Sequence, residues 1–134
     1  MYKYDNSNYR NTIDLLLLNH TIDIADLPFE VRTIEPTFYT TALRYSRGIS
    51  SKKIIEVLSL LCSDIERLYH NHYKEKERLC FLRILYSYVM DIKIISNVEV
   101  TSELMQFLQD AKERFGLGEH LYFTQTDCSE PIKQ

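Results

Sequence analysis

The sequence predicts an all-α fold, a compact bundle of about five helices, and three observations support it. The chain has 134 residues with only three glycines and three prolines, and neither type occurs between Gly48 and Gly116. Apolar residues recur every three or four positions over several stretches, which places them on one face of a helix. A chain of this length forms about one domain with its own core. We therefore predict a single helical domain over 1–134, with mobile tails at 1–7 and 124–134.

The first helix is predicted to begin after an Asn or Ser at positions 6–8 and to end near His20. A side-chain oxygen at its start would accept a hydrogen bond from a free backbone N–H. From 21 to 35 apolar and polar residues alternate, and Pro28 blocks a continuous helix. We expect this segment to be a short extended connector, with a two-stranded pairing inside it.

The second helix is predicted between Pro36, which suits a first helical turn, and Gly48, which suits a stop. Ser50 or Ser51 can then cap a third helix. Its apolar residues step by four and three, the spacing of a seam that packs against a neighbouring helix. This seam consists of Ile54, Leu58, Leu61, Ile65 and Leu68.

The stretch Leu79 to Ile95 is predicted to be the central helix, because its polar residues share one narrow stripe at Arg83, Ser87 and Asp91. It could continue the third helix as one rod, or fold back on it as a hairpin. A rod would expose the mostly polar segment 69–78 in its middle and would need a partner chain. We favour the hairpin, over 51–95, with Asn71 in the left-handed conformation that a turn requires.

The last helix is predicted to begin after Thr101 or Ser102 and to end at Gly116. Its apolar residues form a one-sided stripe. If the bundle covers this stripe incompletely, it becomes a partner-binding surface. The candidate partner-binding residues are Leu104, Phe107, Leu108 and Phe115.

Composition and cysteine usage predict a compartment and restrict the function classes. The net charge of −3 disfavours wholesale coating of nucleic acid. Cys62, Cys80 and Cys128 have no metal-ligand spacing, and the first two lie in apolar runs, so we expect buried thiols in a reducing, cytoplasmic setting. The first residues lack the apolar core of a signal peptide. The central stretch is short and interrupted by charges, so no membrane role is expected.

A basic turn around Gly48 is the best candidate for binding an anion. Lysines at a helix start oppose the helix dipole, so they cost stability unless they meet a negative charge. The segment 38–60 resembles the helix-turn-helix of DNA-binding regulators, which implies a second helix in the major groove. It departs from that pattern where Arg44 replaces a small packing residue. The residues that would contact DNA are Arg44, Arg47, Ser50, Ser51, Lys52 and Lys53.

A second motif is Arg67 followed five residues later by His72. It resembles the spacing in helical nucleases of the HEPN type, which implies ribonuclease chemistry, with His as acid or base and Arg on the phosphate. Leu68 departs from that pattern, because the family has a polar residue there. His70 and His72 are two apart and point to different sides of a helix, so they cannot share a metal ion. The chain has no phosphate-binding loop, dinucleotide fingerprint or Cys-x-x-Cys motif. We therefore predict no catalytic residue, metal or cofactor.

Together these features favour a small, cytoplasmic, non-catalytic interaction protein: an adaptor, an inhibitor or a chaperone. It would bind a protein partner through exposed helix faces, and that partner could be a second copy in a homodimer. The alternative is a DNA-binding transcriptional regulator that uses the basic turn, also as a homodimer.

Overall fold

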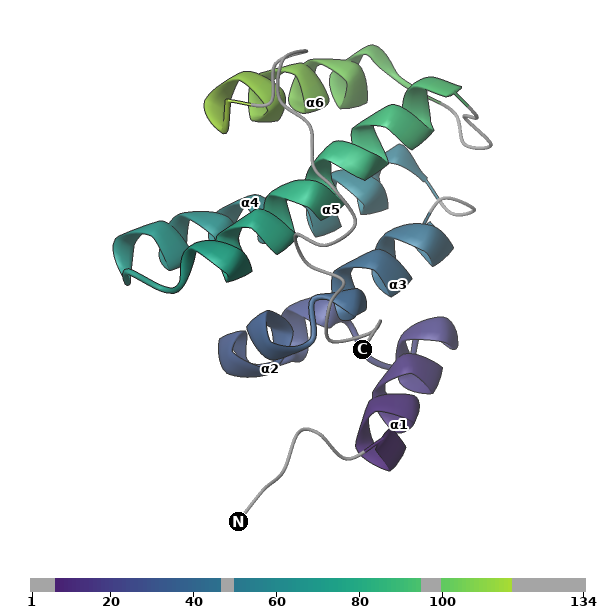
Figure 1. Cartoon of the computed structure of the whole chain (residues 1–134). Coiled ribbons are helices and arrows are strands. Elements are labelled where there is room, and N and C mark those ends of the chain that lie inside the picture. The colour runs from purple at the N-terminus through teal and green to yellow at the C-terminus, as the bar shows by residue number, and fades with distance from the viewer. Residues whose placement is uncertain (1–6, 47–49, 95–99, 117–134) are drawn as a thin grey trace.

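A computed structural model describes residues 7–46, 50–94 and 100–116 of the chain (Figure 1). Every regular element in these ranges is helical, so the all-α prediction is confirmed. The elements are α1 (Ser7–Leu18), the 3-10 helix η1 (Ile24–Asp26), α2 (Phe29–Ile34), α3 (Thr37–Ser46), α4 (Ser51–His70), α5 (Glu75–Ile94) and α6 (Ser102–Arg114). None of the described helices is long and apolar enough to cross a membrane.

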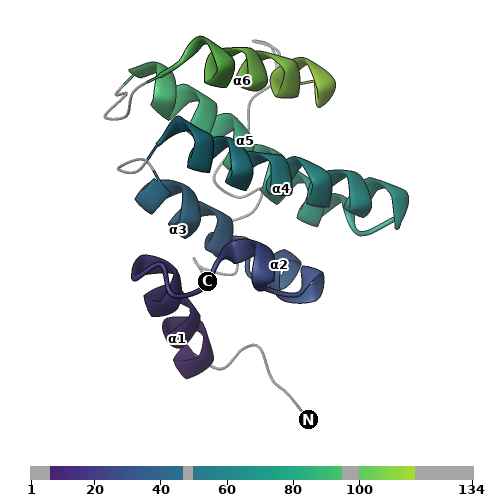
Figure 2. The same ribbon diagram turned by 180° about the vertical axis from the view of Figure 1, so that it is seen from behind.

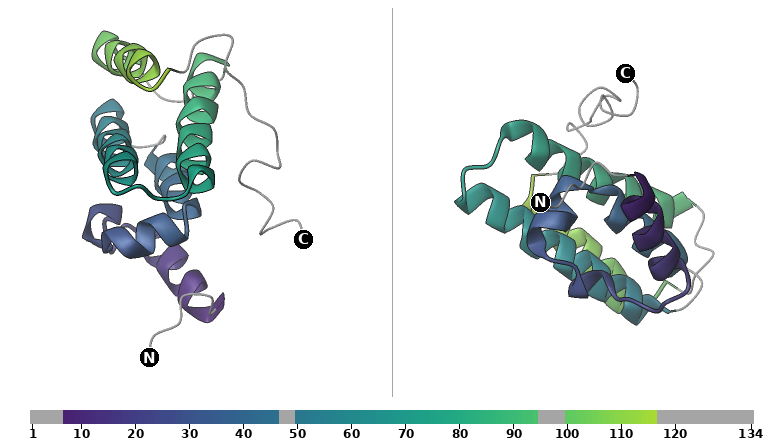
Figure 3. Two further views of the ribbon diagram at one scale, coloured as in Figure 1. Left: turned by 60° about the vertical axis from the view of Figure 1, so that its left-hand side comes forward. Right: turned by 90° about the horizontal axis from the view of Figure 1, so that it is seen from below.

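The helices form a stack of layers with α1 at one end and α6 at the other (Figures 1 and 3). α1 packs on α3, α3 packs on α4, and α6 packs on the opposite side of α4. The view from behind shows α4 running between α3 and α6 (Figure 2). α5 lies beside α4 and also reaches α3, where the rings of Phe81 and Tyr39 meet edge to face at 5.4 Å.

The helix at the centre of this stack is α4, whereas the sequence pointed to the stretch that forms α5. α4 contacts α3, α5, α6 and η1, and its predicted seam, Ile54 to Leu68, is completely buried. α5 does bury Phe81 and Leu85, but Leu79 and Ile84 remain half-buried. Apolar residues around most of a helix indicate that other elements must pack on it. They do not indicate which helix has neighbours on opposite sides.

The predicted hairpin over 51–95 is confirmed, with one correction in its turn. α4 ends at His70 and α5 begins at Glu75. The left-handed residue is His72, at φ 60°, whereas Asn71 has φ −91°. The His72 N–H donates to the Tyr69 carbonyl at 3.3 Å, and the Tyr73 N–H donates to the Leu68 carbonyl at 3.1 Å. This pair of bonds is a Schellman motif, which satisfies the last carbonyls of a helix.

The predicted helix caps are confirmed where the structure describes them. The Ser50 hydroxyl accepts a hydrogen bond from the Lys53 N–H at 3.2 Å, and the Thr101 hydroxyl accepts one from the Leu104 N–H at 3.1 Å. Gly116 follows α6 at φ 72°, the left-handed region. Gly48 and the tails lie outside the described residues, apart from Ser7, which begins α1.

The prediction of an extended connector over 21–35 is wrong, because η1 and α2 form there and the described residues contain no strand. Pro28 precedes α2 as its N-cap residue. The alternation of apolar and polar residues reflects burial of Leu27, Phe29 and Val31, at 5%, 7% and 2% exposure. These contacts come from distant parts of the chain, so they override the local pattern.

A buried polar network joins this connector to α3 and α4. Arg32 and Asp64 are 6% and 1% exposed. The guanidinium donates to both carboxylate oxygens of Asp64, at 2.6 and 2.8 Å, and also to the Leu27 carbonyl. The Tyr39 hydroxyl donates to the same carboxylate. All the partners are internal, so the network belongs to the core, and it links α2 to α3 and α4.

Candidate protein-binding surface

The basic turn at the start of α4 is largely engaged within the chain. Lys53 Nζ lies 3.2 Å from both carboxylate oxygens of Asp23 and 3.8 Å from Glu56. Ser50 is used as a helix cap, and Ser51 is 9% exposed. Arg44 and Lys52 are exposed, whereas Arg47 lies outside the described residues. The structure therefore leaves Arg44 and Lys52 as exposed cations of the predicted DNA-binding set.

A small pocket of about 90 Å³ lies beside this turn, between α1, η1, α3 and α4. Its walls combine apolar side chains, such as Leu17 and Val57, with Asp23, Lys53 and His20. Asp23 and Lys53 are already joined as an ion pair. The described part of the chain contains no group of three or more His, Cys, Asp or Glu residues that could hold a metal ion.

The apolar stripe of α6 is used mainly inside the chain. Leu104 and Leu108 are 0% and 2% exposed, because they pack on the bundle where α6 covers α4. Phe107 and Phe115 are half-buried against the same core. Of the predicted partner-binding residues, these two therefore retain appreciable exposed surface.

The C-terminal end of α4 carries the features that stand out as a binding surface. Phe29, Arg67 and Tyr73 form what we call the Arg67 cluster. The Arg67 guanidinium lies over the Phe29 ring at 3.8 Å from its centroid, and the Phe29 and Tyr73 rings are 6.1 Å apart. Phe29 is buried at 7% exposure, whereas Tyr73 is 40% exposed. The buried ring therefore supports an exposed cation and an exposed aromatic side chain.

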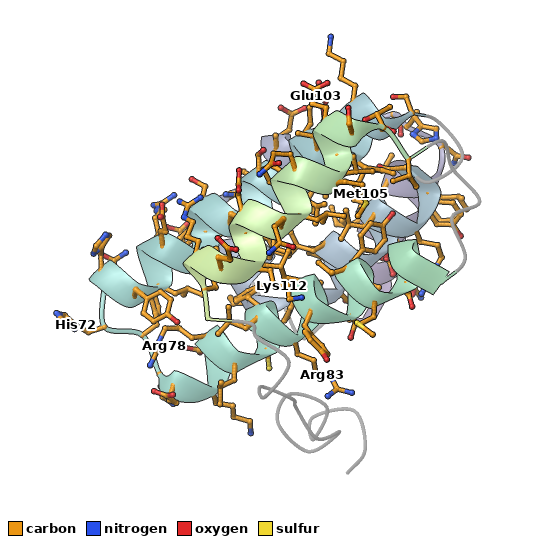
Figure 4. The ribbon with its side chains drawn as sticks, turned by 90° about the horizontal axis from the view of Figure 1, so that it is seen from above. His72, Arg78, Arg83, Glu103, Met105 and Lys112 are labelled. Carbon is orange, nitrogen blue, oxygen red and sulfur yellow. The ribbon has the colours of Figure 1, made fainter. Side chains whose placement is uncertain are left out.

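A second set of stacked groups lies on the α6 side of the same end, and we call it the Tyr69 cluster. The Tyr69 and Phe115 rings stack with an interplanar angle of 7° and centroids 6.4 Å apart. Arg78 covers Tyr69 at 4.3 Å, and Arg114 covers Phe115 at 5.2 Å. Arg78 is paired with Glu75. Figure 4 shows Arg78 at the end of the hairpin below α6.

Glu66 completes the Tyr69 cluster by accepting hydrogen bonds from Arg114. This bond raises the pKa of the Arg114 guanidinium above its already high value, so Arg114 stays charged. Cys62 is buried at 3% exposure one helical turn earlier. Desolvation there raises the pKa of its thiol to about 11, despite an opposing effect of Arg114. Cys62 is therefore a neutral core thiol and supplies no nucleophile at neutral pH.

The ribonuclease motif is not assembled as a pair. Arg67 rests on the Phe29 ring, and His72 points outward from the hairpin end (Figure 4). No hydrogen bond joins the two side chains in the part of the chain that the structure describes.

Sequence reasoning missed most of this surface. It noticed Arg67, but it interpreted Tyr69 to Arg78 only as a polar turn. Two tyrosines within an otherwise polar segment were the available signal. Phe29 and Phe115 are remote from α4 in the sequence, so only the fold brings them there. Comparisons with protein-family models, with curated proteins and with solved structures found no match for this chain.

Proposed function

We propose that this chain is a small, non-catalytic, cytoplasmic interaction protein that binds a protein partner through the C-terminal end of α4. The observation that carries this proposal is the pair of exposed rings there. Tyr69 and Tyr73 are 39% and 40% exposed, and each is held against a second aromatic ring.

Tyrosine and arginine are the residue types that most often dominate the binding energy of protein interfaces. Both rings combine a large apolar area with a hydroxyl, so they suit a surface that is wet when free and covered when bound. Their contacts with Phe29 and Phe115 restrict them before a partner arrives. Such preorganisation reduces the entropy lost on binding.

The test is affinity capture with the full chain from a nuclease-treated lysate of the organism that produces it. The test variant combines Tyr69→Ala with Tyr73→Ala. The matched control is Tyr45→Ala, because Tyr45 is 37% exposed and lies on α3. We expect the parent chain and the control to retain one stoichiometric protein, and the double variant to lose it. Equal retention by the double variant would exclude this surface.

We propose DNA binding by the basic turn as the second candidate, because Arg44 and Lys52 are exposed on adjacent helices. It would neutralise few phosphates, so its affinity for duplex DNA should fall modestly with salt. Changing both residues to Glu should abolish any binding to labelled duplex DNA while the helical circular-dichroism spectrum persists. Unchanged binding by that variant would exclude the turn as the DNA-binding site.

A further inference from the structure

We propose that Arg67 is a carboxylate-binding residue, and that the Arg67 cluster takes an acidic peptide segment of the partner. This inference rests on the proposed function, since it names the chemistry of the partner at the same surface. The Arg67 guanidinium lies over the Phe29 ring, 3.8 Å from its centroid. No ion pair joins it to a carboxylate of the described residues.

Three carboxylates of the surrounding segment that could compete for Arg67 have other partners. Glu66 accepts from Arg114, and Glu75 pairs with Arg78. Glu77 accepts a hydrogen bond from the Lys74 backbone N–H at 3.2 Å, which caps the start of α5. Glu30 is exposed beside Phe29 on α2, but it too forms no ion pair with Arg67 among the described residues. Arg67 is therefore the guanidinium of this surface that lacks a neutralising carboxylate.

Local charge also favours an acidic ligand over a basic one. This end of the molecule has five basic residues and four acidic ones, whereas the whole chain has 16 basic and 19 acidic residues. The basic residues are Arg67, Lys74, Lys76, Arg78 and Arg114, and the acidic ones are Glu30, Glu66, Glu75 and Glu77. The surface therefore has a small positive excess on a protein that is negative overall. This contrast steers acidic segments toward the hairpin end and away from the rest of the molecule.

The geometry suits a carboxylate. Stacking on a ring uses the flat face of a guanidinium and leaves its N–H groups free in their own plane. Two of these N–H groups can donate to both oxygens of one carboxylate. Tyr73, which is exposed and has its ring 6.1 Å from that of Phe29, offers an apolar ring to a neighbouring residue of the same peptide. A sequence that alternates acidic and apolar residues would satisfy both groups.

The test selects random peptides displayed on phage against the immobilised full chain. Arg67→Gln is the test variant, and Arg83→Gln is the matched control, because Arg83 is an arginine on α5 that belongs to neither proposed binding surface (Figure 4). We expect the parent and the control to enrich Asp and Glu over the unselected library, and Arg67→Gln to lose that excess. For one selected peptide, we expect Arg67→Gln and Glu→Gln in the peptide each to weaken binding about tenfold, without further loss when combined.

Three results would overturn the inference: no acidic excess for the parent, an equal excess for Arg67→Gln, or additive losses in the two-sided cycle. A fourth result would overturn it as well. If the parent bound a labelled single-stranded oligonucleotide more tightly than the peptide, and Arg67→Gln lost that binding, Arg67 would be assigned to phosphate. The combined Tyr69→Ala and Tyr73→Ala variant separates the two proposals. If it binds the peptides normally, the proposed function fails. If the double variant loses the selected peptides, and those peptides show no excess of Asp and Glu, only the carboxylate inference fails.

Discussion

The two ends of α4 are both basic in sequence, but their cations are held differently. At the N-terminal end Lys53 lies 3.2 Å from the carboxylate of Asp23, with Glu56 nearby. At the C-terminal end Arg67 lies on the ring of Phe29. A carboxylate neutralises a cation, whereas a ring positions it and leaves its charge. The comparison teaches that two cations of the same helix can differ in their availability to an anion, because the fold places a carboxylate beside Lys53 and a ring beneath Arg67.

The largest effect should come from the middle of α4, where a carboxylate holds a cation in the core. Asp64→Ala leaves Arg32 buried without its partner, so we expect a loss of about 3–5 kcal/mol in the free energy of unfolding. Urea denaturation followed by circular dichroism measures it. The double variant with Arg32→Met and Asp64→Leu should recover part of that loss, because it removes both charges. A loss below about 1 kcal/mol would mean that solvent reaches the network.

A smaller effect should separate the two ends of α4 by their response to salt. Lys53→Gln removes a surface ion pair, worth about 0.2–1 kcal/mol at low ionic strength. Arg67→Gln removes a stacked guanidinium, worth about 0.5–1 kcal/mol at an exposed site. In 1 M NaCl the Lys53 effect should vanish because exposed charges are screened. Much of the Arg67 effect should persist, because part of it is contact with Phe29. Equal screening of both would contradict the comparison.

The last pair of effects concerns the left-handed residues that follow α4 and α6. His72 has φ 60°, where side chains with a Cβ are strained. His72→Gly should stabilise the fold by about 0.5 kcal/mol, the relief of strain minus the added freedom of the unfolded chain. After α6, Gly116→Ala should lower the free energy of unfolding by about 1 kcal/mol. The cause would be the left-handed backbone conformation, since nothing lies within 4 Å of an added Cβ. Thermal unfolding measures both, and changes of the opposite sign would contradict this interpretation.

The α4–α5 hairpin, the serine and threonine caps and the buried seam of α4 could all be predicted from sequence. Each depends on residues that are close together in the chain, such as apolar residues at helical spacing, a hydroxyl three residues before the N–H that it caps, or a glycine just after a helix. The prediction for the segment 21–35 was wrong for the opposite reason. Its helix α2 is joined to the fold by contacts that are remote in sequence, such as that of Arg32 with Asp64, which is 32 residues away. The left-handed turn residue was missed by one position, because Asn and His both tolerate that conformation.

By itself, the sequence determined the helical class, because period and the scarcity of glycine and proline act locally and need no partner. Tertiary structure decided which helix lies at the centre and which cations remain without a carboxylate. Charges interact through distance in space. A lysine and an arginine that look alike in sequence therefore diverge once Asp23 lies beside one and Phe29 beneath the other. The candidate surface at the end of α4 exists only because α2 and α6 bring Phe29 and Phe115 to it.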